Sequence, residues 1–333
     1  MEQLYLSHQD TIWKLCFGFA NTSVLYALIK SGVIEELRNE PKTLEELVYA
    51  CGLDPDVLYR TLRFAIIIDV VNLVEEKYSL TDVGKFLLKD VPGSVYYGLL
   101  LVGSEPWQKA WQNFIYSLTI GENSFESAMR TPFFDFLNQH PRYGTPYNQW
   151  MTSSTNFASK AITEAYDFSS FSSVCDIGGG QGILLKHILT ENPHLSGILF
   201  DQESVVETHL LTDQDSKIKI QAGNFFDNVP KADVLILKSI LHYWNDEKSL
   251  TILKNCQKVM NPDSRLLIIE MIIESTTDII GAFYDLNMQI LLNGKERTEE
   301  EFNLLLQKAD LKLNRIIPTK SPMKIIEVVR TRY

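Results

Sequence analysis

His242 is the residue whose type and position most clearly allow chemistry. It follows residues 233–238, a short run of aliphatic and β-branched side chains that predicts a strand of a parallel sheet. Open α/β sheets bind ligands beyond the carboxyl ends of their strands, and His242 is the one histidine of six placed there. Glu270 lies within the next predicted strand and Glu296 follows a turn at 293–295, so two carboxylates could converge on the imidazole.

A histidine between two carboxylates is suited to activating a hydroxyl. A phenol, with a pKa near ~10, is a poor nucleophile until a base removes its proton. A carboxylate on the second ring nitrogen fixes the tautomer and stabilises the imidazolium that forms. Because a lone histidine at a strand end is more often structural, the hypothesis of a general base depends on the two glutamates.

A glycine-rich loop ends the first strand predicted for the same sheet. Residues 176–182 have the sequence DIGGGQG, whose glycines let the backbone approach a ligand closely. The dinucleotide fingerprint GxGxxG, counted from Gly178, would need glycine at 183, where the chain has isoleucine. The next predicted strand ends at Asp201, whose carboxylate can accept both hydroxyls of a ribose. The loop and Asp201 together predict a nucleoside cofactor.

The elements that must hold these residues begin near residue 172, where β-branched runs alternate with helical stretches. This alternation is typical of a mostly parallel sheet. Strands are predicted at 173–177, 196–201, 217–222, 233–238, 266–273, 313–318 and 324–330. The link at 319–323 is too short for a parallel crossover, so the last two strands are predicted to be antiparallel. The clearest helix is 246–260, with Asn245 as its N-cap.

The first part of the chain is predicted to be helical almost throughout. An apolar helix covers residues 11–30. A capping box of Thr43 and Glu46 opens a second helix, and Asp54 opens a third. Residues 72–81 predict a small β-hairpin, with helix resuming after it. Helices followed by a hairpin form a winged-helix arrangement.

Composition limits the partners of this chain. A net charge of -11 and a pI near 5.1 argue against nucleic acid, whose phosphates are bound by clustered Lys and Arg. Within residues 41–71 three basic side chains stand against five acidic ones. The alternative of a DNA-binding regulator therefore fits poorly, and a packing and dimerisation module is favoured.

Cysteine spacing and the N-terminus bear on metal binding and location. The four cysteines lie far apart without metal-ligand spacing, so no metal site is predicted. The N-terminus lacks a signal-peptide pattern, and no segment is expected to reach the ~20 apolar residues of a membrane span. We therefore expect a cytoplasmic location without a membrane partner.

Three regions are expected along the chain. Residues 1–100 form the winged-helix domain, residues 101–170 a helical linker and pocket region, and residues 171–333 the cofactor-binding sheet. The middle region is rich in aromatic side chains. Most of them are expected in the core, and some should line a pocket for a small molecule.

These features together resemble a known family, the caffeate-type plant and bacterial small-molecule O-methyltransferases, which include acetylserotonin and hydroxyneurosporene methyltransferases. The resemblance covers nearly the whole chain. It is seen in the winged-helix region at about 20–90 and in the motifs DIGGGQG (176–182), LFDQ (199–202), GNFF (223–226), LKSILHYWNDE (237–247) and DLNMQILLNGKERTEEEF (285–302). It implies a Rossmann-like seven-stranded methyltransferase sheet with an antiparallel last strand, S-adenosylmethionine as cofactor, homodimerisation through the N-terminal domain and a role in secondary metabolism.

The resemblance also implies roles for individual residues. The residues implied at the cofactor are Gly178, Gly180, Gly182, Asp201, Asn224, Phe225 and Lys238. His242 matches the general base of the family, and Glu270 and Glu296 match the glutamates that flank it. The residues implied at the methyl acceptor are Met151, Tyr243 and Met288.

Two departures from the family pattern bear on the ligands. Asn224 stands where the family usually has aspartate, so we expect altered affinity for adenine rather than lost binding. Ser239 and Tyr243 replace an aromatic residue and an aspartate of the plant members, which argues against a monolignol acceptor.

Two other activities remain open from the sequence. A pseudo-methyltransferase would bind the same cofactor but catalyse decarboxylation, dehydration or a pericyclic step. N-methylation of a heteroaromatic ring would need no base, so the presence of His242 favours oxygen as the acceptor atom.

Overall fold

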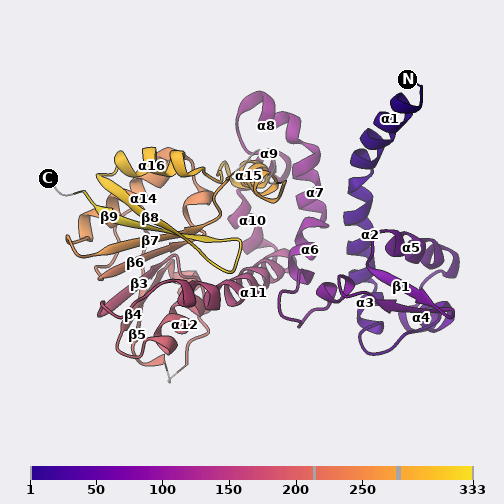
Figure 1. Cartoon of the computed structure of the whole chain (residues 1–333), viewed down its shortest axis with the longest axis horizontal. Coiled ribbons are helices and arrows are strands. Elements are labelled where there is room, and N and C mark those ends of the chain that lie inside the picture. Colours follow the sequence, from indigo (N-terminus) through magenta and orange to yellow (C-terminus); the bar gives the residue numbers. More distant parts are fainter. Residues whose placement is uncertain (1, 213–214, 275–278, 332–333) are drawn as a thin grey trace. The chain divides into compact units, whose positions relative to one another are not determined.

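The computed structural model describes residues 2–212, 215–274 and 279–331 (Figure 1). Contacts within the chain divide it into two compact units, which are described separately. The N-terminal unit consists of Met1–Lys109 and Leu137–Ser153, and the sheet unit of Ala110–Phe136 and Ser154–Tyr333. The division expected near residues 100 and 170 stays a prediction.

The N-terminal unit has its own hydrophobic core of short helices and a hairpin. Its helices include α2 (Gly18–Lys30), α3 (Val33–Glu36), α4 (Leu44–Cys51), α5 (Pro55–Ile67) and α6 (Tyr96–Val102). The capping box is confirmed, because Thr43 Oγ1 accepts the Glu46 N–H at 3.3 Å and the Glu46 carboxylate accepts the Thr43 N–H at 2.7 Å. Asp54 caps α5 as predicted, and β1 (Val71–Val74) pairs with β2 (Lys77–Leu80) in the predicted hairpin.

The chain after the hairpin differs from the expected helix. Only one 3-10 turn, Gly84–Leu87, forms there. The Thr81 hydroxyl donates to Asp69 O at 2.7 Å and accepts the Gly84 N–H at 2.8 Å. These bonds fix the chain to the end of α5, and the next α-helix begins only at Tyr96.

The first two helices expose many apolar side chains. The single helix predicted over 11–30 is instead α1 (Glu2–Cys16) and α2, which meet at Phe17. By length and composition alone Ser7–Lys30 could cross a membrane, so the expectation that no segment reaches this length is wrong. The exposed apolar side chains of this stretch include Ile12, Trp13, Leu15, Phe17 and Phe19.

The sheet unit is built on seven strands and confirms the predicted fold class (Figure 1). The strands are β3 (Ser173–Ile177), β4 (Ser196–Asp201), β5 (Ile218–Ala222), β6 (Val234–Lys238), β7 (Arg265–Glu270), β8 (Leu311–Pro318) and β9 (Lys324–Arg330). Their order is β5-β4-β3-β6-β7-β9-β8. Neighbours from β5 to β7 are parallel, and β9 is antiparallel to both β7 and β8, which confirms the predicted final pair.

Strand β7 ends earlier than its apolar run suggested. The sequence predicted a strand to residue 273, whereas β7 stops at Glu270. Beyond it the chain leaves the sheet, and Ile272 forms an isolated bridge with Arg297 instead. The earlier end places the Glu270 carboxylate at the edge of the sheet.

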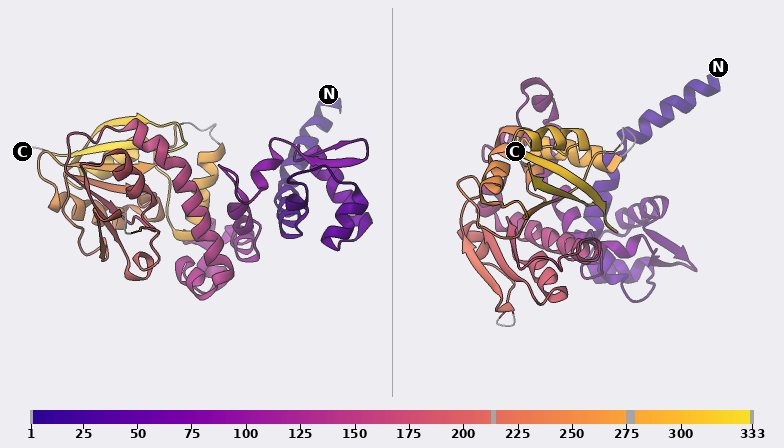
Figure 2. Two further views of the ribbon diagram at one scale, coloured as in Figure 1. Left: turned by 90° about the horizontal axis from the view of Figure 1, so that it is seen from below. Right: turned by 60° about the vertical axis from the view of Figure 1, so that its left-hand side comes forward.

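Side chains alternate between two hydrophobic layers along the central strands. Leu235 and Leu237 of β6 enter one cluster, whereas Val234 and Ile236 enter the other. The first cluster is covered by α14 (Asp246–Val259) and α16 (Glu299–Gln307). The second is covered by α12 (Ile183–Glu191) and by the part of α11 (Pro141–Ala165) that follows residue 153 (Figures 1 and 2). This doubly covered sheet explains why these strands are apolar on both faces.

A buried carboxylate links the last two strands. Glu327 of β9 is 3% exposed, and its two oxygens accept hydrogen bonds from Arg315 Nε and Nη2, each at 3.0 Å. Burial alone would raise the pKa of Glu327, but hydrogen bonds from Arg315, Asn314 and Tyr166 hold it below its usual value. A carboxyl with a lowered pKa stabilises the folded state above its unfolded pKa, and that stabilisation is lost as the pH falls.

We expect Glu327→Gln to lower the free energy of unfolding by about 1–3 kcal/mol at pH 7, because a charge-assisted pair is replaced by a weaker one. The difference from wild type should shrink as the pH falls below 4.5, the usual pKa of the group. Denaturant unfolding at several pH values measures it, with the exposed Glu207→Gln as control. A loss of stability that does not change with pH would contradict this account.

Candidate active site

The glycine loop at 176–182 connects β3 to α12 at the carboxyl edge of the sheet. Gly178, Gly180 and Gly182 have φ angles of 70°, 58° and 83°, a region that favours glycine. A Cβ at Gly178 would lie 2.4 Å from Ile240 Cδ1, whereas a Cβ at Gly180 would meet no heavy atom within 4 Å. The loop is therefore closed by Ile240 on one side and open at Gly180.

Asp201 ends β4 beside this loop. Its Oδ2 accepts the N–H of Gly180 at 2.9 Å, and its Oδ1 accepts the N–H of Gln202 at 2.7 Å. Burial raises the pKa of the Asp201 carboxyl, and the two hydrogen bonds oppose that rise. Each carboxylate oxygen has a second lone pair, so Asp201 can still accept hydrogen bonds from a ligand.

Asn224 and Phe225 follow β5. Asn224 is exposed, and its Oδ1 accepts the N–H of Phe226 at 3.0 Å within a local turn. Phe225 lies edge-on to the ring of Trp244, with 6.3 Å between the ring centroids. The buried Asn255 of α14 donates to Phe225 O at 3.0 Å, which fixes the backbone of this turn.

Lys238 ends β6 among several carboxylates. Its Nζ donates to Thr155 Oγ1 of α11 at 3.2 Å. Burial lowers the pKa of Lys238 to about 8, although Asp176 and Glu270 oppose the change. Burial also raises the pKa of Asp176 to about 7, with Lys238 opposing and Asp201 adding to the rise. Thr155 had no signal in the sequence, because a threonine inside a predicted helix is unremarkable by type and spacing.

His242 sits in a 3-10 turn, Leu241–Tyr243, just beyond β6. Its Nδ1 lies 2.8 Å from Glu296 Oε1, and the exposed fractions of the two side chains are 13% and 1%. When Nδ1 donates this hydrogen bond, the lone pair of Nε2 is available. Among the described residues, neither His242 Nε2 nor Glu296 Oε2 has a hydrogen-bond partner.

Glu270 forms hydrogen bonds with the backbone at His242 and not with its ring. Its Oε1 accepts the backbone N–H of Ile240 at 3.0 Å and of His242 at 3.1 Å. Within the described chain, Glu296 alone of the two glutamates makes a hydrogen bond to the imidazole. Both carboxylates lie near His242, but Glu296 bonds the ring whereas Glu270 bonds the backbone of the turn after β6, and the roles predicted for them stay predictions.

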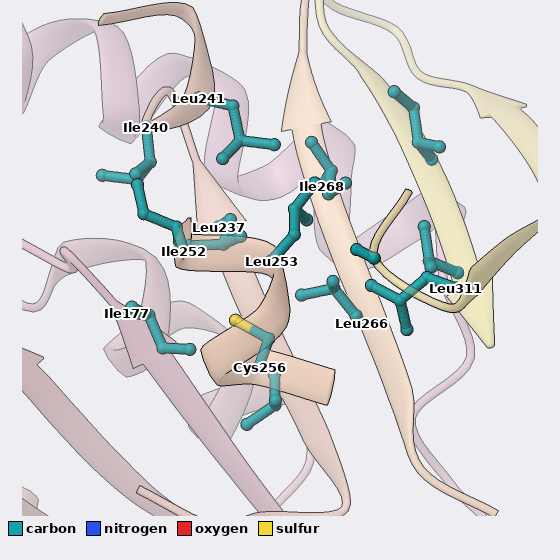
Figure 3. Packing of buried hydrophobic residues seen from close by; sticks show 14 of the residues in the cluster. Ile177, Leu237, Ile240, Leu241, Ile252, Leu253, Cys256, Leu266, Ile268 and Leu311 are labelled. Atoms are coloured by element: carbon teal, nitrogen blue, oxygen red, sulfur yellow. The ribbon is translucent and has the colours of Figure 1, made fainter. Parts of the chain in front are cut away.

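Hydrophobic packing also holds the turn that carries His242. Ile240 and Leu241 are 7% and 0% exposed and belong to the cluster under α14. Figure 3 shows them beside Leu237 of β6 and Ile252 of α14. Burial of two aliphatic side chains, together with the backbone bonds to Glu270, leaves the turn little freedom.

The pKa of His242 is set by opposing effects. Burial alone would lower it, but the charge and hydrogen bond of Glu296, with the charge of Glu270, raise it above the usual value of 6.5. Burial raises the pKa of Glu270, and the His242 charge opposes that rise. The imidazole is therefore a stronger base than burial alone would allow.

The three residues predicted to contact the methyl acceptor lie in three different elements of the chain. The Tyr243 ring lies 4.3 Å from that of His242 and 5.7 Å, edge-on, from Phe134, measured between centroids. Met288 is buried in α15 (Ile279–Leu292), which packs against the His242 turn. Met151 belongs to α11 within the N-terminal unit, so its predicted role stays a prediction.

Phe134 is a neighbour of the site that was not singled out. It belongs to an aromatic-rich stretch in which core and pocket residues share the same type and helical spacing. Its contact with Tyr243 distinguishes it, and that contact depends on the fold. Across the residues that the structure describes, no group of three or more His, Cys, Asp or Glu side chains is arranged to hold a metal ion.

The sheet order, the glycine loop and the strand-end acid define a Rossmann-like enzyme that binds a nucleoside cofactor. Comparison with known families makes this specific. An O-methyltransferase domain matches residues 111–312, and an O-methyltransferase dimerisation domain matches residues 13–90. The chain therefore belongs to the S-adenosylmethionine-dependent O-methyltransferase family.

Individual relatives match over nearly their whole lengths. The phenazine O-methyltransferase PhzM of Lysobacter antibioticus is 33% identical over 317 residues, which is 93% of each chain. The solved structure of the mitomycin 7-O-methyltransferase MmcR matches with a TM-score of 0.93 at 29% identity, covering 99% of this chain and 100% of that one. CalO1, a methyltransferase of calicheamicin biosynthesis solved with bound S-adenosylhomocysteine, matches with a TM-score of 0.89 at 31% identity, covering 98% and 99%.

The Glu296–His242 contact makes a prediction that does not depend on catalysis. In Glu296→Gln the pKa of His242 should fall from above 6.5 to below it, because the charge that opposes burial is removed. Titration of isotope-labelled histidines by NMR measures this, with the His242 signal assigned by its loss in His242→Gln. Glu247→Gln, an exposed change in the first turn of α14, should leave the pKa unchanged.

Proposed function

We propose that His242 is the general base for methyl transfer to a hydroxyl of a small aromatic molecule. The observation that supports this most directly is the arrangement of the imidazole. Its Nδ1 is held by a buried carboxylate, and its Nε2 is buried without a hydrogen-bond partner in the described structure. A buried, unpaired lone pair is costly unless a ligand supplies the missing donor.

The reaction follows from this arrangement. S-adenosylmethionine supplies a methyl group on a sulfonium sulfur and is converted to S-adenosylhomocysteine. His242 Nε2 takes the proton of the acceptor hydroxyl as its oxygen forms the new C–O bond and the S–CH₃ bond breaks. Glu296 stabilises the resulting imidazolium through Nδ1, and the proton then passes from Nε2 to solvent.

The residues around the glycine loop fit this cofactor. Gly180 has open space where a side chain would be, and Asp201 retains acceptor capacity beside it. We infer that the loop from Gly178 to Gly182 holds the methionine part, Asp201 the ribose, and Asn224 with Phe225 the adenine. Lys238 interacts with the charge of Asp176 at the start of this loop. We infer that Lys238 helps to position the cofactor.

The acceptor is inferred to be aromatic because aromatic rings surround the base. Tyr243 lies against the imidazole, Phe134 lies edge-on to Tyr243, and Met288 adds a buried apolar surface on α15. Flat ring systems pack well against such surfaces. One relative is named for phenazine, so hydroxyphenazines should head the panel of phenols that is screened as acceptors.

We further infer a cytoplasmic homodimer formed through the N-terminal unit. The exposed Trp13, Phe17 and Phe19 lie within the residues that match the dimerisation domain. A dimer interface would cover these side chains and would explain an apolar stretch that is also long enough to span a membrane. Light scattering of detergent-free protein distinguishes the two explanations.

Replacing the base tests the proposed function. His242→Gln should reduce kcat by roughly 10²–10⁴-fold, because glutamine can still bond Glu296 but cannot accept the proton. Formation of the methylated product and of S-adenosylhomocysteine is followed by mass spectrometry over the phenol panel. His194→Gln, an exposed histidine outside the site, should behave as wild type.

Two outcomes would change the assignment. Undiminished methylation by His242→Gln would remove the residue from its role as base. Consumption of a substrate without any S-adenosylhomocysteine would favour the rival in which the cofactor is bound but a decarboxylation, dehydration or pericyclic step is catalysed.

The turn after β5 yields a separate prediction about cofactor affinity. Asn224→Asp should lower the Kd for S-adenosylmethionine by roughly 5-fold, since an ionised acceptor bonds the adenine amino group more strongly than an amide oxygen does. Isothermal titration calorimetry measures it. Asn228→Asp adds the same charge to the same turn and should have a smaller effect; equal effects would show a general electrostatic attraction instead of an adenine contact.

A further inference from the structure

Arg297 is an unusual residue for the interior of the sheet unit. Its side chain is 0% exposed, and charged side chains are seldom fully buried unless they are paired. It directly follows Glu296, the partner of the imidazole, and precedes the N-cap of α16, Thr298. A buried guanidinium at this point needs several acceptors to offset the loss of water.

The acceptors of Arg297 all lie in one short segment. Nη1 donates to Leu241 O at 3.0 Å, and Nη2 donates to Trp244 O at 2.9 Å. Nε and Nη2 also reach Asp246 Oδ1 at 3.1 and 2.9 Å, and Nη2 lies 3.1 Å from Ser249 Oγ. The guanidinium therefore binds the backbone on both sides of the pair His242–Tyr243.

The backbone near Arg297 also contacts the turn that carries His242. Lys295 N–H donates to His242 O at 2.9 Å. A Cβ at Gly294 would lie 2.0 Å from His242 O, so only glycine allows this approach. On the other side, Ile273 N–H donates to Arg297 O at 3.2 Å, which ties this segment to the chain leaving β7.

We propose that Arg297 is a positioning residue that fixes the turn carrying His242 against the segment carrying Glu296. Its planar fork donates to Leu241 O from Nη1 and to Trp244 O from Nη2, a fixed spacing of donor nitrogens that the single ammonium nitrogen of lysine lacks. The distance between His242 Nδ1 and Glu296 Oε1 then follows from two segments that Arg297 joins. This inference rests on the proposed function of His242 as the base.

A residue that only stabilised the fold would have different consequences. Its loss would lower stability and weaken every ligand, but it would not act selectively through the pair of His242 and Glu296. A positioning residue lowers kcat more than it changes cofactor affinity, since a misplacement near 1 Å can cost about 10²-fold in rate. Its effect is also lost when the interaction that it positions has already been removed.

The first experiment measures the imidazole directly in the full-length chain. In Arg297→Met the NMR titration midpoint of His242 should fall below that of wild type, because a displaced Glu296 no longer offsets burial. The matched control is Arg315→Met, which removes the same charge from the partly exposed arginine bound to Glu327. An unchanged His242 midpoint in Arg297→Met would overturn the proposal, whether or not any acceptor is methylated.

The second experiment uses the best acceptor of the phenol panel. Arg297→Met should lower kcat about 10²-fold while the Kd for S-adenosylmethionine stays within about 3-fold of wild type. Arg297→Lys should recover part of the loss. The double variant with Glu296→Gln should be no more than about 2-fold slower than Glu296→Gln alone; multiplied effects in the double variant would instead assign Arg297 to fold stability.

A milder substitution tests the same proposal if Arg297→Met does not fold. Asp246 is 52% exposed in its side chain, and Asp246→Asn weakens the hold on the guanidinium while leaving an oxygen in place. It should lower both kcat and the His242 midpoint by smaller amounts than Arg297→Met. Asp263→Asn, on an exposed turn before β7, should change neither; equal behaviour of the two variants would contradict the proposal.

Discussion

The hydrogen bond between Glu296 Oε1 and His242 Nδ1 is the interaction on which the proposed chemistry of this protein depends. Burial by itself would weaken the imidazole as a base, and a solvent-exposed imidazole would lack a fixed direction. The buried carboxylate removes both difficulties, because it favours the protonated ring and fixes which nitrogen faces the ligand. The cost is a desolvated charge, which must be compensated by the surrounding structure.

The turn that carries His242 is held by the ends of two adjacent strands. Glu270, at the end of β7, accepts the N–H groups of the turn that follows β6, so the two strand ends are held together by one carboxylate. The side chains of Ile240 and Leu241, in the same turn, are buried in the hydrophobic layer under α14. These bonds are possible because a parallel sheet brings successive strand ends to one edge, where a single carboxylate can reach the next turn.

The sequence was sufficient for the sheet and insufficient for the contacts at its edge. Strands β3, β4 and β9 have their predicted bounds, since buried β-branched runs have few other structures available. The sequence also placed Glu270 near His242, but it could not tell a bond to the ring from a bond to the backbone. Arg297 has no signal in the sequence either, because a charged residue between Glu296 and Thr298 is typical of an exposed turn.

The carboxylates and the aromatic rings of the site contact His242 in different ways. His242 is held by Glu296 through its ring and by Glu270 through its backbone, whereas the Tyr243 ring packs 4.3 Å from the imidazole and also contacts Phe134. A change of Phe134 therefore breaks neither carboxylate bond, whereas a change of Tyr243 removes a ring that packs against the imidazole. On the proposed function, acceptor preference would be set by these aromatic side chains, and the catalytic step by the two carboxylates that hold His242.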